Sequence, residues 1–255
     1  MTSAANLDYA QARLQARHGV RARPSDWSRI EGSRDLQHFL SVATTSPLSR
    51  WVRGLTPEMS AHDLERVLRL EWSQYVREIA SWLPAAWQPA VVWAGTLTDL
   101  QFVARLADPA PCPAWMFADP LFGSVAPGPP AERAASLALT ELAPLAPAVA
   151  TSADVRAAWH TQWQRRLPGM DQDTAYHLQR LTRTVAARIA GSAASGPAAG
   201  STAVGSTQRI ERIFREAAGT AVSALAHLAL TALDLERLRG CLAERAVFSR
   251  ARQAA

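Results

Sequence analysis

The sequence predicts an all-α protein, and three observations support that prediction. Apolar residues recur at spacings of three and four through most of the 255-residue chain, as in helices with one buried face. Ser, Asp, Pro and Gly residues stand where these periodic segments begin and end. No convincing run of alternating apolar and polar residues indicates a strand. We therefore expect a multi-helix bundle.

The most regular segment, residues 60–83, predicts one long amphipathic helix. Ser60 can cap the first amides, Asp63 can act as the acid of a capping box, and Pro84 follows the last apolar position. The polar residues expected to point largely away from the core are Arg66, Arg69, Gln74, Arg77 and Glu78. The apolar face comprises Leu64, Val67, Leu68, Trp72, Tyr75, Val76, Ile79, Trp82 and Leu83.

Shorter helices are expected before this segment, each with its own boundary residue. Asn6 can cap the first helix and Gly19 can end it. Ser33 can cap the third, and Pro47 suits the first turn of the fourth. The four helices are expected at 7–17, from residue 24 onward, at 33–43 and at 47–55.

The middle of the chain predicts a helix followed by an irregular segment. Residues 91–107 are expected to form another long helix despite Gly95. Seven of the 16 prolines lie in 108–130, a density that excludes a regular helix or central strand. The same segment contains large apolar residues, so it should pack over the helices as a connector: Trp115, Met116, Phe117, Leu121 and Phe122.

The C-terminal part is expected to be helical again. The predicted helices cover 131–142, 153–167 with Ser152 as the cap, 173–190 and 207–253, with kinks or breaks at Gly219 and Gly240. The helix at 173–190 should bury Tyr176, Leu178, Leu181, Val185 and Ile189. Residues 191–206 lack large apolar groups and predict a flexible loop.

The predicted organisation is an N-terminal helical subdomain at 1–107, a packed connector at 108–130 and a C-terminal helical subdomain at 131–255. The apolar segment 217–233 is short and Ala-rich, which favours a buried core helix over a membrane span. The N-terminus lacks a secretory signal pattern. Cys112 and Cys241 suggest neither a disulfide framework nor a zinc site, so a reducing cytoplasm is expected.

The residues do not predict a catalytic or metal site. His62, Asp63 and Glu65 fan around a helix start, where capping is the better explanation than metal binding. Asp171 and Asp173 resemble a magnesium-binding pair, but acids are common at helix N-termini. No phosphate-binding loop or nucleophile elbow is present, and the Cys112 thiol has no recognisable base partner. We expect a protein without enzymatic activity or cofactor.

Charge leaves several partners open. The formal charge is +5, and all 27 basic residues are arginine. Arg180, Arg183 and Arg188 follow one another along a predicted helix and are the candidate partner-binding residues. Such a stripe could contact phosphates, but interleaved acids favour a solvated face of mixed charge, and no nucleic-acid partner is expected. The nine tryptophans are expected to be core or interface anchors.

Three stretches resemble the family of central-stalk subunits that join the stalk to the rotor ring in rotary V-type and A-type ATPases. The first, 7–17, contains Tyr9, Ala12 and Arg13 in an aromatic-Ala-Arg pattern. The second is 33–52, a short helix followed by small polar residues. The third is 61–84, which contains Glu65 and Leu68 and ends at Pro84. Residues 234–240 show a weaker similarity.

The resemblance implies a non-catalytic coupling role in ion transport. Members of that family form funnel-like helical bodies that join the stalk to the membrane rotor ring, on the cytoplasmic face of the membrane. The implied partners are rotor-ring and stalk subunits, and the three arginines would meet acidic loops or headgroups. The alternative is a cytoplasmic helical adaptor or assembly chaperone for a membrane or redox complex.

Overall fold

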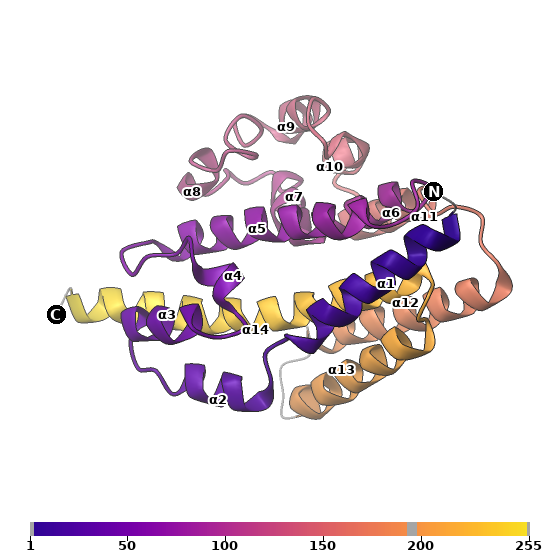
Figure 1. Cartoon of the computed structure of the whole chain (residues 1–255). Helices are drawn as coiled ribbons and strands as arrows, with labels where there is room; N and C mark the ends of the chain where they lie inside the picture. The colour runs from indigo at the N-terminus through magenta and orange to yellow at the C-terminus, as the bar shows by residue number, and fades with distance from the viewer. Residues whose placement is uncertain (1–2, 193–197, 254–255) are drawn as a thin grey trace. The chain divides into compact units, whose positions relative to one another are not determined.

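Every regular element of residues 3–192 and 198–253, the part described by the computed structural model, is helical (Figure 1). The all-α prediction is therefore confirmed for these residues. The helices before the central one are α1 (Ser3–Gly19), α2 (Pro24–Glu31), α3 (Leu36–Thr44) and α4 (Ser49–Val52). The long helix α5 (Ala61–Ser81) follows.

The remaining helices form two groups along the chain. The first group is α6 (Gln88–Ala94), η1 (Gly95–Asp99), α7 (Leu100–Leu106), α8 (Ala114–Phe117), α9 (Pro130–Leu137), η2 (Ala143–Leu145), α10 (Ala146–Ala150) and α11 (Val155–Gln164). The second is α12 (Gln172–Ser192), α13 (Ala198–Glu216) and α14 (Ala221–Gln253).

The chain divides into two compact units. Unit 1 comprises Met1–Glu71, Glu78–Ala85 and Gly169–Ala255, and unit 2 comprises Trp72–Arg77 and Ala86–Pro168. The middle of α5 thus clusters with unit 2, whereas its two ends cluster with unit 1. Unit 1 is built from segments that are far apart in the sequence, whereas the predicted subdomains are each one continuous segment.

Helix α5 begins with the predicted capping box. The Ser60 hydroxyl accepts the Asp63 amide at 3.1 Å, and the Asp63 carboxylate accepts the Ser60 amide at 3.4 Å. The hydrogen bond from the Ser60 hydroxyl lowers the pKa of Asp63. All residues of the predicted apolar face are buried except Val67, which is half-buried. Contrary to the prediction that it points outward, Arg69 is buried; because α5 contributes to both units, one apolar stripe does not describe its buried surface.

The core of unit 1 surrounds the N-terminal half of α14. This helix packs against α1, α3, α12 and α13, and almost every side chain in 221–231 is buried (Figure 1). The prediction of a buried core helix in this segment is confirmed. Gly219 has a positive φ of 80° and separates α13 from α14, as predicted. Gly240 lies inside the continuous helix α14, so the kink or break predicted there is absent. In the described residues no helix is long and apolar enough to cross a membrane.

The prediction of a flexible loop at 191–206 is wrong for most of this segment. Gly191 and Ser192 end α12, and α13 already begins at Ala198. Residues 193–197 lie outside the described residues. The physical reason is that alanine is the best helix former, and the buried residues Ile210, Ile213 and Phe214 anchor a helix that extends backward through this segment.

The proline-rich connector of unit 2 packs as predicted. Its buried residues include Met116, Phe122 and Val125, each fully inaccessible to solvent. Most of the segment consists of turns, and its helix α8 is only four residues long. Phe117, in contrast, has half of its surface exposed.

The long helix expected at 91–107 is broken into α6, η1 and α7. The Trp72 indole donates to the Gly95 carbonyl at 3.0 Å, at the residue where η1 begins. A Cβ at Gly95 would lie 3.2 Å from Val76 Cγ1, so the Gly95 backbone packs closely against the Val76 side chain. The Trp159 indole donates to the Thr96 hydroxyl at 2.9 Å, and this hydroxyl donates to the Trp93 carbonyl. These tertiary contacts favour a 3₁₀ turn.

Eight of the nine tryptophans are buried, so they belong to the core rather than to an exposed surface. In unit 2 the Trp93 indole donates to the Trp159 carbonyl, and the Trp163 indole donates to the Ala90 carbonyl. Buried indoles usually find such acceptors, because an unsatisfied N–H is unfavourable away from water.

Two caps and two core residues differ from the sequence predictions. Asp35, not Ser33, caps α3, because its carboxylate accepts the His38 amide at 2.8 Å. Asp154, not Ser152, caps α11 and accepts the amides of Arg156 and Ala157. On α12, Leu178 and Leu181 are buried as expected, whereas the residues that remain largely exposed are Tyr176 and Ile189.

Candidate functional site

The three candidate arginines lie on α12, but two of them are already in ion pairs within unit 1. The Arg180 guanidinium bonds to Glu216 of α13 and lowers the pKa of that carboxyl. Arg188 donates to Glu236 of α14 at 3.1 Å. Arg183 is exposed and forms no ion pair with another described residue. The face therefore has the mixed charge that the interleaved acids predicted.

An aromatic side chain adjoins these arginines on the same helix. Tyr176 is 57% exposed, and the Arg180 guanidinium lies 5.3 Å from its ring centroid. Arg183 is seven residues after Tyr176, so both lie on one face of α12. We call Tyr176, Arg180 and Arg183 the α12 patch. It can offer an exposed ring and one cation to an acidic partner without breaking an internal ion pair.

A second polar cluster connects the three stretches that resemble the stalk subunit. The Glu78 carboxylate of α5 accepts Arg17 of α1 at 2.6 Å and Arg50 of α4 at 2.8 Å. The Arg13 guanidinium of α1 lies 4.4 Å from the Trp82 ring that follows α5. All of these residues belong to unit 1. Sequence periodicity did not predict the Glu78 contacts, because their partners are 28 and 61 positions away.

The interior of unit 1 contains a cluster of histidine and charged residues. The His18 ring stacks on Phe214 with centroids 4.4 Å apart, and the His227 ring lies 6.3 Å from His18. Burial lowers the pKa of His227 to about 3, and the charges of His18, Arg21 and Arg17 contribute to this shift. His227 is therefore neutral near pH 7, and the cluster acts as part of the core.

Arg21 provides the charged part of this interior. It donates to Asp234 at 2.9 Å and lies 3.7 Å from a carboxylate oxygen of Glu211. Burial raises the pKa of Asp234, although the Arg21 hydrogen bond opposes the shift. A buried charge requires a paired partner, and Arg21 supplies one that links α14 to the end of α1.

The acids that could suggest a metal site instead begin helices. Asp63 completes the capping box of α5, and Asp171 accepts the Thr174 amide at 2.7 Å and its hydroxyl at 2.9 Å before α12. Glu65 forms an ion pair with Arg239 at 3.0 Å. Over the described ranges, no group of three or more His, Cys, Asp and Glu residues could hold a metal ion.

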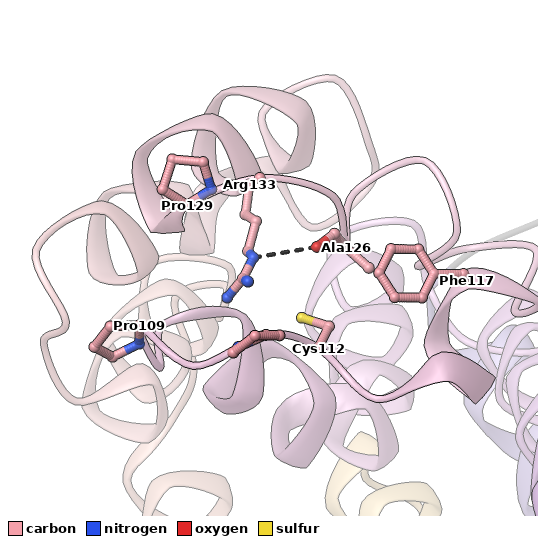
Figure 2. Close-up of a pocket in the computed structure, with 8 residues that line it drawn as sticks. Pro109, Cys112, Phe117, Ala126, Pro129 and Arg133 are labelled. Atoms are coloured by element: carbon pink, nitrogen blue, oxygen red, sulfur yellow. Dashed lines mark hydrogen bonds between the residues drawn. The ribbon is translucent and has the colours of Figure 1, made fainter.

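Unit 2 contains a pocket in the proline-rich segment, with a volume of about 330 Å³. Figure 2 shows the Arg133 side chain extending toward Pro109 and Cys112. The pocket walls include Pro109, Cys112, Phe117, Ala126, Pro129 and Arg133. Arg133 could not be identified from the sequence, because the carbonyls it binds are 7 to 27 positions away in the chain.

Comparisons with protein-family models, with curated proteins and with solved structures find no match to this chain. The resemblance to the rotary-ATPase stalk family therefore depends on the three stretches of sequence alone.

Proposed function

We propose that this chain is a non-catalytic subunit of a rotary V-type or A-type ATPase, which couples the central stalk to the membrane rotor ring during ion transport. The main supporting observation is the Glu78 cluster. Arg17, Arg50 and Glu78 come from the three separate stretches that resemble the family, and one carboxylate joins them. Arg17 and Arg50, which are 61 and 28 positions from Glu78 in the chain, thus meet it in unit 1, and this contact supports treating the three stretches as one structural unit.

A coupling subunit must transmit torque, and the Glu78 cluster adds contacts that hold three helices of unit 1 together. Two part-buried ion pairs fix α1 and α4 to α5, each worth up to about 1 kcal/mol. Stacking of Arg13 on Trp82 adds a further contact between α1 and the end of α5. The family's funnel-like arrangement and peripheral position at the membrane remain part of this proposal.

The α12 patch is the proposed docking surface for an acidic loop of the rotor ring or stalk. Arg183 carries the available charge, and Tyr176 offers an exposed ring beside it. Rim charges of this kind mainly increase the association rate and set the register of docking. The partner surface should therefore be acidic, and its binding should weaken as salt rises.

The test is affinity purification of the tagged chain from detergent-solubilised membranes of its own organism. We expect the nucleotide-binding and rotor-ring subunits to be recovered with it. Recovery of a different membrane or redox complex would overturn the proposal and favour the adaptor or assembly-chaperone function. The tryptophans give that alternative little support, because eight of the nine are buried.

A charge reversal tests the docking surface separately. Arg183→Glu should reduce recovery of the ATPase subunits at low salt, because it places an acid opposite an acidic partner. Arg156→Glu is the matched control, since Arg156 is an exposed arginine of unit 2 and forms no ion pair with a described residue. Equal recovery with both variants would remove the α12 patch from the proposal while leaving the coupling role intact.

A further inference from the structure

We propose that the pocket around Arg133 binds a small apolar monocarboxylate. The Arg133 pocket is defined by Pro109, Cys112, Phe117, Pro129 and Arg133 (Figure 2). A carboxylate would bond to the guanidinium, and its apolar body would lie against the prolines and Phe117. This site is in unit 2 and does not depend on the proposed rotary-ATPase function.

The hydrogen bonds of Arg133 leave one donor for a ligand. Nε donates to the Ala126 carbonyl at 3.2 Å, and Nη1 donates to the carbonyls of Leu106 and Asp108 at 3.3 and 2.8 Å. Nη2 donates to the Ala110 carbonyl at 3.2 Å. A guanidinium has five N–H donors, so these four bonds leave one Nη2 hydrogen without an acceptor in the described residues.

The charge of Arg133 also lacks a counterion. The residue is only 3% exposed, and it forms no ion pair with any carboxylate in the described ranges. Asp108 accepts an Arg133 hydrogen bond through its backbone carbonyl. Its side-chain carboxylate instead binds Arg105 and the Ala110 amide. Carbonyl dipoles solvate the cation without neutralising it. A buried, unneutralised guanidinium favours an anion, and one carboxylate oxygen can accept the remaining Nη2 hydrogen.

The walls of the pocket indicate which carboxylate would fit. Proline rings form much of the lining, and Phe117 is half-exposed at the edge, so the ligand should carry an apolar body. A volume of about 330 Å³ lies at the lower end of the range for small-molecule sites. Because only one charged side chain lines the pocket, a single anionic group is expected.

A helix dipole and one charged side chain contribute to the electrostatic potential at the pocket edge. Helix α9 begins at Pro130, next to the lining residue Pro129, and its N-terminal dipole favours an anion. Glu132 opposes this effect, because its exposed carboxylate lies beside Gly128, where a Cβ would be 2.3 Å from Oε2. Removing the Glu132 charge should therefore tighten binding of the carboxylate.

The direct test is calorimetric titration of the full chain with hexanoate, and with hexanamide as the neutral analogue. We expect hexanoate to bind at least about tenfold more tightly, a difference that one hydrogen bond to a charged group supports. Equal affinity for the two probes would overturn the proposal, as would the absence of hexanoate binding.

Variants at the pocket edge test the role of charge without removing Arg133, whose four backbone hydrogen bonds support the fold. Phe117→Glu and Phe117→Gln remove the same aromatic ring, but only the first adds an anion. We expect Phe117→Glu to weaken hexanoate binding about tenfold more than Phe117→Gln, and Glu132→Gln to tighten it. Equal weakening by both Phe117 variants would show that binding does not depend on charge at the pocket and would contradict the proposal.

Thiol labelling locates the bound probe. The chain contains two cysteines, of which Cys112 lines the pocket and Cys241 belongs to unit 1. Hexanoate should slow alkylation of Cys112 by iodoacetamide in a saturable way, and it should leave Cys241 labelling unchanged. Binding without protection of Cys112 would place the carboxylate elsewhere and overturn the assignment of this pocket.

Discussion

His227 is completely buried beside His18, and this makes unit 1 sensitive to acid. The pKa of His227 is lowered from 6.5 to about 3, so in this interval the unfolded chain binds a proton that the folded chain does not. The free energy of unfolding therefore falls as pH decreases from 6.5 toward 3. By pH 5 the loss from this group reaches about 2 kcal/mol.

His227→Gln should remove that part of the acid sensitivity, because glutamine stays neutral throughout the interval. The measurement is chemical unfolding at pH 7.5 and at pH 5, with His38→Gln, a change at an exposed histidine, as the control. We expect the variant to lose about 2 kcal/mol less than the parent chain between these values. An identical loss in both would contradict the assignment of a neutral, buried His227.

Individual residues also differ in how well the sequence predicts their role in the candidate sites. The clustering of the α12 arginines makes them candidate partner-binding residues, which stays a prediction, whereas the ion pairs with Glu216 and Glu236 agree with the expected mixed-charge face. Glu78 and Arg133 were not identified, because neither belongs to a local motif. Their partners are distant in the chain, and only the packing of several helices brings them together.

Helices with local start signals are predicted well from the sequence, whereas helix interruptions are not. The capping box of α5 is encoded within four consecutive residues, Ser60 to Asp63. The break at Gly95 depends on the Trp72 indole, which is 23 positions away. The prediction for 198–206 is wrong for a related reason, since the low apolar content of this segment conceals a helix stabilised by residues further along α13.

Two glycines of the C-terminal helices provide a paired test of backbone conformation. Gly240 lies inside α14, is exposed and has open space where a Cβ would be added, so Gly240→Ala should stabilise the chain by about 1 kcal/mol. Gly219 has a φ of 80°, so Gly219→Ala should destabilise it by about 1 kcal/mol. Urea unfolding midpoints measure both. Stabilisation by Gly219→Ala would contradict the positive φ between α13 and α14, and destabilisation by Gly240→Ala would contradict its exposed position inside α14.

The division of the whole molecule predicts which fragments can fold. Unit 2 takes Trp72–Arg77 from α5, and Trp72 supplies a hydrogen bond to Gly95 inside that unit. A fragment of residues 86–168 should therefore lack part of its core, whereas a fragment of 60–168 retains all of α5. We expect cooperative thermal unfolding, followed by circular dichroism, only for the longer fragment. Cooperative unfolding of 86–168 with an equal midpoint would show that α5 is dispensable for unit 2.

The discontinuity of unit 1 also has a consequence for biosynthesis. Helices α1 and α3 are translated before unit 2, whereas their packing partner α14 is translated after it. At the usual rate of about 5–20 residues per second, the intervening unit takes on the order of ten seconds to synthesise. During that delay the nascent chain exposes Phe39 of α3, and the Arg245 guanidinium of α14 later lies 4.6 Å from the centroid of its ring. Chaperone association with ribosome-bound chains should therefore persist until α14 has emerged.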